Sequence, residues 1–327
     1  MKSRSSLTSQ LSLLFKREKN PISGLLTVEW IAMAYLVLTL IMMAVLHERL
    51  VNTEDMLKGR LQFVVITLAV WGVYRLWSCR LTLFARIAVQ MIFLSWWYPD
   101  TYELNRMLPN LDHVFASCEQ ALFGCQPALV FSQHVPWGWF SELMCLGYIS
   151  YFPLMLLVLL YYFFRRYDEF RLASIVILGT FFVYYTIFIL LPVTGPQFYY
   201  QAVGIEKIAS GIFPNLGDWF LTHSQRMAAP GWSDGFFYHL LELTHDAGER
   251  PTAAFPSSHV GVTTVLLLLA LRTRCRSFIM TVTVFYILMC FSTVYIFAHY
   301  AIDVIAGLTT GILLYCLLIR TKKMGLR

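Results

Sequence analysis

Apolar residues fall into eight blocks along the chain, separated by stretches that hold most of the polar and charged residues. A hydrophobic segment of about 20 residues is long enough to cross a bilayer as a helix. The pattern therefore predicts an all-α fold, a polytopic transmembrane helical bundle of about eight spans. The predicted spans are residues 25–46, 61–78, 82–98, 137–163, 172–193, 257–271, 277–297 and 301–319.

Composition favours a membrane protein over a large soluble helical one. Of the 327 residues, 58% are hydrophobic and 13% are charged, and that charged fraction is about half of the usual value in soluble domains. No linker divides the chain, so residues 25–327 are interpreted as one integral-membrane domain. Residues 1–24 lack the apolar core, about 7–15 residues long, of a cleavable signal peptide, and we expect them to be a cytoplasmic segment.

The basic residues are distributed unevenly between the two sides of the predicted bundle. Eight spans place both termini on one side, and 18 of the 25 Lys and Arg residues lie there. Because loops rich in Lys and Arg stay in the cytoplasm, we expect cytoplasmic termini and no nucleic-acid-binding patch. The extracytoplasmic side then carries the two longest loops, residues 99–136 and 194–256. Loops of this length usually have a function of their own.

The seven cysteines show no spacing with histidine that is typical of a zinc site. Cys118 and Cys125 fall on the extracytoplasmic side, where a disulfide is chemically permitted. If the stretch between them is helical, they lie about 10 Å apart, beyond disulfide reach. Both states, paired and free, stay open. We expect neither a metal nor another cofactor.

Candidate chemistry first appears in the stretch "AAFPSSHVGVTTV". Pro256 suits the first turn of a helix, where its missing N–H costs nothing. Ser257 and Ser258 then place hydroxyl groups beside free backbone N–H groups, an arrangement suited to an anion such as phosphate. His259 follows within the first turn. Taken alone, the serine pair is equally well explained as a plain helix cap.

The second candidate is the apolar stretch "STVYIFAHYAIDVIAG", which contains His299 and Asp303. Ionisable side chains are costly in hydrocarbon and usually mark function. If both residues lie one turn apart on one helix, the carboxylate accepts one ring N–H and frees the other nitrogen to act as a nucleophile. The topology places both histidines at the same membrane face. This combination predicts phosphoryl transfer through a phosphohistidine, with His299 attacking and His259 protonating the leaving oxygen.

The remaining polar residues have weaker patterns. His239 and His245 are expected to be solvated, and Glu142 is expected to face the cavity. Glu103 and Asp112 are interpreted either as contacts to a polar substrate group or as solvated loop carboxylates.

The stretches "FPSSHVG" and "STVYIFAHYAIDVIAG" resemble the last two motifs of the type-2 phosphatidic acid phosphatase superfamily. The upstream "LLPVTGPQFYY" matches less specifically, which places the motifs within residues 192–307. The resemblance implies a six-helix catalytic core and membrane lipids as substrates. It implies the following roles: His299 as nucleophile, Asp303 as its orienting partner, His259 as general acid, and Ser257 and Ser258 as phosphate ligands.

The sequence departs from the phosphatase branches of that superfamily where they hold phosphate-clamping cations. Ser292-Thr293 replaces a Ser-Arg pair, and Leu243 stands where a Lys would precede Arg250-Pro251. The chain is therefore more similar to the inositol phosphorylceramide synthase and sphingomyelin synthase branch. Further candidates for binding phosphate are Gly195, Pro196, Gln197 and Arg250. Other candidate sources of positive charge are Arg106, Lys207 and Arg226.

These observations favour a membrane enzyme that transfers a phosphorylated, inositol-phosphate-like head group from a phospholipid to a ceramide-like or other lipid hydroxyl. The alternative is a lipid phosphate phosphatase that hydrolyses a monoester such as phosphatidic acid. A diester carries one charge fewer than a monoester, so the missing cations favour transfer. A transporter is disfavoured because the polar residues cluster at one surface and no internal repeat is visible. A relative without catalytic activity is a further alternative.

Overall fold

The regular secondary structure of residues 12–324, the part that this computed structural model describes, is helical apart from one isolated β-bridge between Arg17 and Cys79. Predicted segment 1–24 therefore lies partly outside the described residues. The longer helices are α2 (Thr27–Val45), α3 (Thr53–Leu76), α4 (Arg80–Asn105), α7 (Gly138–Ile149), α8 (Tyr151–Arg165), α9 (Tyr167–Leu190), α12 (Phe236–Gly248), α13 (Ser258–Thr273), α14 (Arg276–Tyr295) and α15 (Ala301–Leu318). The shorter ones are α5 (Asp112–Phe123), α6 (Pro127–His134), α10 (Pro196–Val203), α11 (Ile205–Ala209), η1 (Trp219–Leu221) and η2 (Ile319–Met324).

The predicted all-α, polytopic membrane bundle is confirmed. Among the described residues, six helices are long and apolar enough to cross a membrane, namely α2, α3, α4, α9, α14 and α15 with its extension to Thr321. Helices α7 and α8 pass the same test only as a pair, which is bent by 48°. The predicted span 257–271 forms α13, whose 16 residues fall short of the usual length. Length and composition thus give six or seven spans where eight were predicted.

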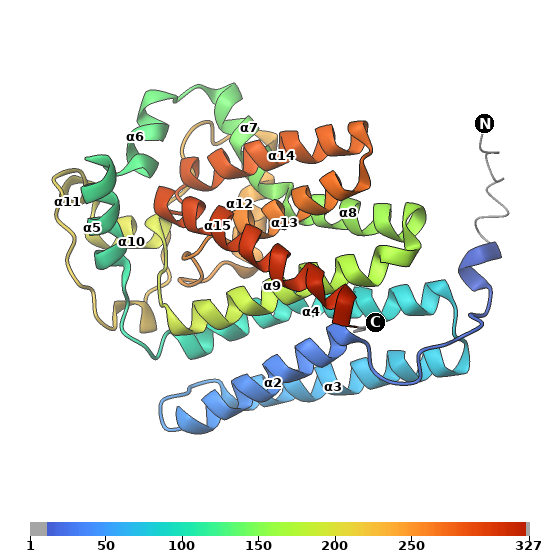
Figure 1. Cartoon of the computed structure of the whole chain (residues 1–327). Coiled ribbons are helices and arrows are strands. Elements are labelled where there is room, and N and C mark those ends of the chain that lie inside the picture. The colour runs from blue at the N-terminus through green and yellow to red at the C-terminus, as the bar shows by residue number, and fades with distance from the viewer. Residues whose placement is uncertain (1–11, 325–327) are drawn as a thin grey trace.

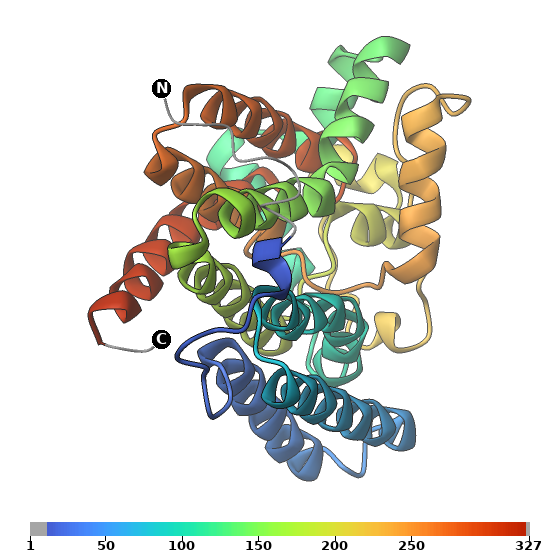
Figure 2. The ribbon, with the colours of Figure 1, turned by 90° about the vertical axis from the view of Figure 1, so that its right-hand side faces the viewer.

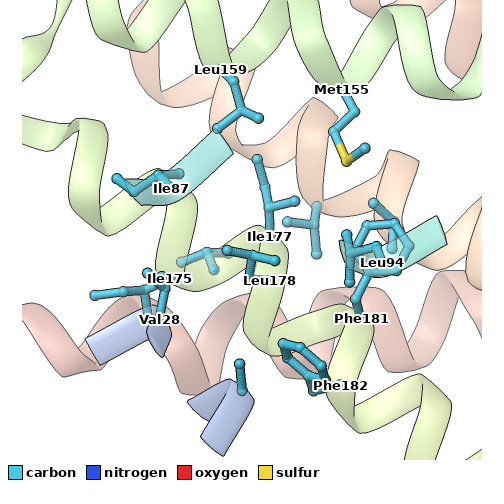
Figure 3. Packing of buried hydrophobic residues seen from close by; sticks show 14 of the residues in the cluster. Val28, Ile87, Leu94, Met155, Leu159, Ile175, Ile177, Leu178, Phe181 and Phe182 are labelled. Carbon is cyan, nitrogen blue, oxygen red and sulfur yellow. The ribbon is translucent and has the colours of Figure 1, made fainter. Parts of the chain in front are cut away.

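The helices form a bundle around α9 and α13 (Figure 1). Helix α9 is apolar around most of its circumference and is buried on most sides, as such a pattern requires. Helices α2, α3 and α4 lie together on one side of it (Figure 2). Figure 3 shows part of the buried core around α9, where Ile177 and Phe181 of α9 lie near Leu94 of α4 and Met155 of α8. Helix α13 packs against α8, α9, α14 and α15.

Helices α13 and α15 approach each other unusually closely because two glycines of α15 face α13. A Cβ atom on Gly307 would lie 2.5 Å from the carbonyl oxygen of Ser257, and one on Gly311 would lie 2.6 Å from that of Gly261. Small residues permit such backbone contact between membrane helices. The contact holds the N-terminus of α13 beside the start of α15, the two segments that carry the predicted motifs.

Buried ion pairs join the first three long helices. Arg86 of α4 binds Glu29 of α2, with Nε 2.8 Å from Oε1, and Arg60 of α3 binds Asp100 of α4 through two contacts of 2.8 Å. All four side chains are at most 5% exposed. Charges inside a membrane bundle are usually paired in this way.

The two long connecting segments are structured. Residues 99–136 contain the end of α4 together with α5 and α6, and residues 194–256 contain α10, α11, η1 and α12. Helices α5, α6, α10 and α11 gather at one end of the bundle (Figure 1). Cys118 lies on α5 and Cys125 just beyond it, and both thiols are free. Of the two states left open by the sequence, the structure shows the unpaired one.

Candidate active site

Two histidines from separate segments face each other in the interior. His259 lies in the first turn of α13, and His299 lies in the connection between α14 and α15. The Nε2 atom of His299 is 3.3 Å from the Nδ1 atom of His259. The His259 ring also contacts Tyr148 and Tyr151, with ring centroids 4.5 and 4.4 Å away. The structure thus brings together the two histidines that the sequence motifs indicate.

A hydrogen bond determines which nitrogen of His299 carries the proton. Its Nδ1 atom lies 2.8 Å from the carbonyl oxygen of Ala254. A carbonyl only accepts hydrogen bonds, so Nδ1 is protonated and the lone pair of the neutral ring is on Nε2. Burial lowers the pKa of His299 to about 4, opposed by the hydrogen bond to Ala254 and the charge of Glu249. At pH 7 the ring therefore presents an unprotonated nitrogen toward His259.

Asp303 is placed differently from the expectation. The sequence predicts His299 and Asp303 on one helix, with the carboxylate accepting the ring N–H. However, α15 begins at Ala301, so His299 precedes the helix. The Asp303 carboxylate lies 3.6 Å from Nδ1 of His299, and its Oδ2 accepts the backbone N–H of Tyr300 at 2.8 Å. Asp303 is thus close enough to act on the charge of the ring, while Ala254 is the hydrogen-bond acceptor.

The N-terminus of α13 has free donors, as expected for an anion site. Ser257 is the N-cap residue, and its Oγ accepts the N–H of Val260 at 3.3 Å. The N–H of Ser257 itself donates to the carbonyl of Asp303 at 3.0 Å. Ser258 and His259 occupy the first helical positions, where backbone N–H groups have no acceptor within the helix. These two N–H groups are suitably placed for a phosphate oxygen.

The predicted segment Gly195–Gln197 lies against the loop that carries the predicted nucleophile. The N–H of Gln197 donates to the carbonyl of Phe297 at 2.7 Å. Gly195 has a φ of 89°, and a Cβ atom there would lie 2.7 Å from the carbonyl oxygen of Ala298. Both the backbone conformation and the lack of space therefore require glycine at this position.

No motif in the sequence points to Glu249, yet its carboxylate lies at the site. Its Oε1 accepts hydrogen bonds from the hydroxyl of Tyr98 at 3.3 Å and from Nε2 of Gln197 at 3.1 Å. Burial raises the pKa of Glu249 above its ordinary value, opposed by the charge of His299. A carboxyl group with a raised pKa takes up a proton more readily, which reduces its repulsion of a phosphate.

The predicted cationic residues lie elsewhere or are already paired. Arg250 is exposed and donates to the carbonyl of the adjacent Glu249 at 3.0 Å. Arg226 is held by Glu242 at 2.7 Å and by Asp246 at 3.1 Å. Of the other two candidates, Arg106 is paired with Glu103 and Lys207 is exposed.

A cavity of about 440 Å³ lies beside His259. Its walls come from α4, α7, α8, α9 and α12 and are mainly aromatic and aliphatic, for example Leu94, Phe152 and Phe181. Ser258 and His259 stand among its polar lining residues, and no Lys or Arg is found among the described residues of the lining. A larger hollow of about 770 Å³ at the α8–α9 connection is lined by charged residues and does not include either histidine.

Three further side chains differ from their predicted surroundings. His245, predicted to be solvated, is 3% exposed and lines the cavity. Its position four residues after the buried Leu241 is a signal for this burial. Glu142 was expected to face the cavity. Its carboxylate instead accepts hydrogen bonds from the N–H groups of Phe237 and Tyr238 and thereby caps α12. The third residue is Asp112, for which contact with substrate or with solvent was expected. Its side chain is fully buried and accepts hydrogen bonds from protein groups.

The site thus combines, inside a helical bundle, two facing histidines with the N-terminus of α13. The family model of the PAP2 superfamily matches residues 112–317, and the protein belongs to this superfamily. This membership indicates a membrane lipid phosphatase or phosphotransferase. No match to the chain was found among curated proteins or among solved structures. Within residues 12–324, no group of three or more His, Cys, Asp or Glu side chains is arranged to hold a metal ion.

Proposed function

We propose that the protein transfers a phosphorylated head group from a phospholipid to the hydroxyl of a second lipid, as in the inositol phosphorylceramide synthase and sphingomyelin synthase branch. The donor carries an inositol-phosphate-like head group, and the acceptor is ceramide-like or another lipid alcohol. The observation that carries this proposal is the unprotonated Nε2 of His299, which faces His259 at 3.3 Å, while His259 lines a largely apolar cavity.

In the first half-reaction, Nε2 of His299 attacks the phosphorus of the donor. The bond between phosphorus and the glycerol oxygen breaks, and His259 gives its proton to that oxygen, so diacylglycerol leaves. An anionic phosphate bound beside the two rings favours the protonated form of His259. In the second half-reaction the acceptor hydroxyl attacks the phosphohistidine, His259 takes the hydroxyl proton, and His299 is regenerated.

The charges around the cavity support a diester donor over a monoester. A monoester carries up to two negative charges, and burying them without a paired cation is costly. No Lys or Arg is found among the described lining residues, and Arg226 is already neutralised by two carboxylates. The singly charged diester fits the two free N–H groups at the start of α13 better.

The site is proposed to lie at the extracytoplasmic face, with both termini in the cytoplasm. The distribution of Lys and Arg along the chain supports this orientation. Helices α5, α6, α10 and α11, which belong to the two long segments expected on the outer side, gather at one end of the bundle (Figure 1). The α14–α15 connection with His299 contacts these segments through Gln197.

The test is a reconstituted assay with phosphatidylinositol, labelled in its head group, with and without ceramide. We expect label on ceramide only when both lipids are present, and none with the His299→Ala variant. Release of inorganic phosphate from phosphatidic acid, without any transfer to ceramide or to a diacylglycerol acceptor, would contradict the proposal and identify a phosphatase.

A further inference from the structure

Helix α12 carries a histidine that the proposed reaction does not use. His245 is 3% exposed and lines the cavity together with Ser258 and His259. Neither of its ring nitrogens has a hydrogen-bond partner in the part of the chain that the structure describes. Glu242 on the same helix lies 4.0 Å from Nδ1, beyond hydrogen-bond distance, and its carboxylate is bound by Arg226.

Two unpaired nitrogens on a buried ring require an explanation, because buried polar groups are usually hydrogen-bonded. The ring is held in place by its surroundings. Glu142 caps the start of α12, Leu241 of the same helix is fully buried, and the ring of Tyr148 makes an edge contact with His245 at 5.7 Å. A molecule in the cavity is therefore the natural source of partners for this imidazole.

The position of His245 is close to the place expected for the phosphate. Tyr148 contacts His245 and also stacks on His259, with the ring centroids 4.5 Å apart and the planes 26° from parallel. One aromatic ring therefore connects the two histidines. If a lipid substrate places its phosphate at His259, the atoms that contact His245 belong to the polar part of that lipid.

We propose that His245 is a subsite for a hydroxyl group of the lipid substrate, namely a hydroxyl of a polyol head group on the donor. A neutral imidazole offers one donor and one acceptor, and a hydroxyl both donates and accepts. A phosphate oxygen uses only the donor, and a trimethylammonium group uses neither. Burial and the positive charge of Arg226 lower the pKa of His245 to about 3, which keeps the ring neutral. The inference rests on the proposed function, since it names a group of the same substrate.

The test compares two donors with the same acyl chains, phosphatidylinositol and phosphatidylcholine, in the transfer assay. His245→Phe removes both nitrogens, and His245→Gln keeps a donor and an acceptor. We expect His245→Phe to raise KM for phosphatidylinositol about tenfold, the effect of one lost hydrogen bond, with the value for phosphatidylcholine unchanged. His245→Gln should keep most of the affinity. His239→Phe is the matched control, because His239 is exposed on the same helix and does not line the cavity.

Other outcomes overturn the inference. An equal change in KM for both donors, or no change for either, shows that His245 does not recognise a hydroxyl of the donor head group. A change confined to KM for ceramide also contradicts a donor subsite and assigns His245 to the acceptor hydroxyl.

A binding measurement separates this inference from the proposed reaction. Binding of both labelled donors is measured with the His299→Ala protein in nanodiscs, where no turnover is expected. A preference for phosphatidylinositol that the further change His245→Phe abolishes supports the subsite, even if the wild-type protein transfers no head group. Equal binding of both donors with and without His245→Phe would overturn the subsite and leave the proposed reaction untouched.

Discussion

The carboxylate of Asp112 accepts a hydrogen bond from the hydroxyl of Tyr300 at 3.0 Å, although 188 positions separate the two residues. The same oxygen accepts the N–H of Gly195 at 2.9 Å, and the other accepts the N–H and the hydroxyl of Thr194 at 2.7 and 2.9 Å. Tyr300 directly follows His299, and Gly195 packs against the residue before it. One buried carboxylate therefore binds the side chain that follows the predicted nucleophile and the backbone segment that packs against the residue before it.

Replacing this carboxylate should weaken both the fold and the activity. Asp112→Asn substitutes an amide NH2 for an acceptor oxygen, so at least one backbone N–H loses its partner, at a cost of about 1–3 kcal/mol. We expect a thermal unfolding midpoint several degrees lower and a large loss of turnover. Asp218→Asn, at an exposed position, serves as the control. An unchanged midpoint for Asp112→Asn would show that this network does not support the site.

Gly195→Ala should be far more harmful than Gly211→Ala. Both glycines have positive φ, 89° and 73°, so both substitutions carry backbone strain. Only at Gly195 does the new Cβ also meet other atoms, with the carbonyl oxygen of Ala298 at 2.7 Å, whereas nothing lies within 4 Å at Gly211. Turnover and thermal midpoint are measured for both variants. Equal effects would mean that the close contact beside His299 does not matter.

Variants of the two histidines should separate their roles. His299→Ala should abolish turnover and the covalent intermediate, a loss of several orders of magnitude. His259→Ala should fail on natural donors but keep activity on an activated aryl phosphodiester, whose leaving group needs no proton. The readout is acid-labile, base-stable phosphorus on the protein. Labelling that persists in His299→Ala would reject His299 as the nucleophile.

The stability of the protein should decline with pH in part through Glu119. This residue of α5 is buried and accepts the N–H of Ile302 at 3.2 Å. Burial raises the pKa of Glu119 to about 8, opposed by that hydrogen bond, while an unfolded glutamate titrates near about 4.3. Between these pH values the folded state holds a proton that the unfolded state releases. The contribution of Glu119 to the free energy of unfolding is therefore full below about pH 4 and is lost as the pH rises through about 8.

Glu119→Gln should remove this part of the pH dependence. We expect its thermal midpoint to exceed that of the wild type at pH 8, with a smaller difference at pH 5. Glu206→Gln, at an exposed position, should leave the pH profile as it is. A Glu119→Gln profile parallel to that of the wild type would argue against the raised pKa.

The orientation in the membrane can be checked with two reporters. Because most Lys and Arg residues lie on the side of the termini, a reporter fused to the C-terminus should be cytoplasmic. Ser210→Cys, in a chain that also carries Cys118→Ser, should react with an impermeant thiol reagent added from outside. Labelling of Ser210→Cys only after the membrane is opened would place the site on the cytoplasmic side.

The amino-acid sequence by itself determined the helical membrane bundle and the two segments that carry the histidines. Hydrophobic blocks predict helices because a lipid environment forces the backbone to satisfy its own hydrogen bonds. The Pro-Ser-Ser-His pattern marks the start of α13 because capping depends on residues within one turn. Both signals are local, so no knowledge of distant contacts is needed to find them.

Only the tertiary structure decided which groups surround His299. The acceptor for its ring is Ala254, 45 positions away, because α15 begins after His299 and its first turn uses Asp303 as a cap. The burial of Asp112 and His245 and the position of Glu249 beside His259 in the cavity lining likewise depend on which helices meet. The energy of a buried polar group is set by neighbours that are remote in the chain, and a linear pattern of apolar and polar residues does not contain that information.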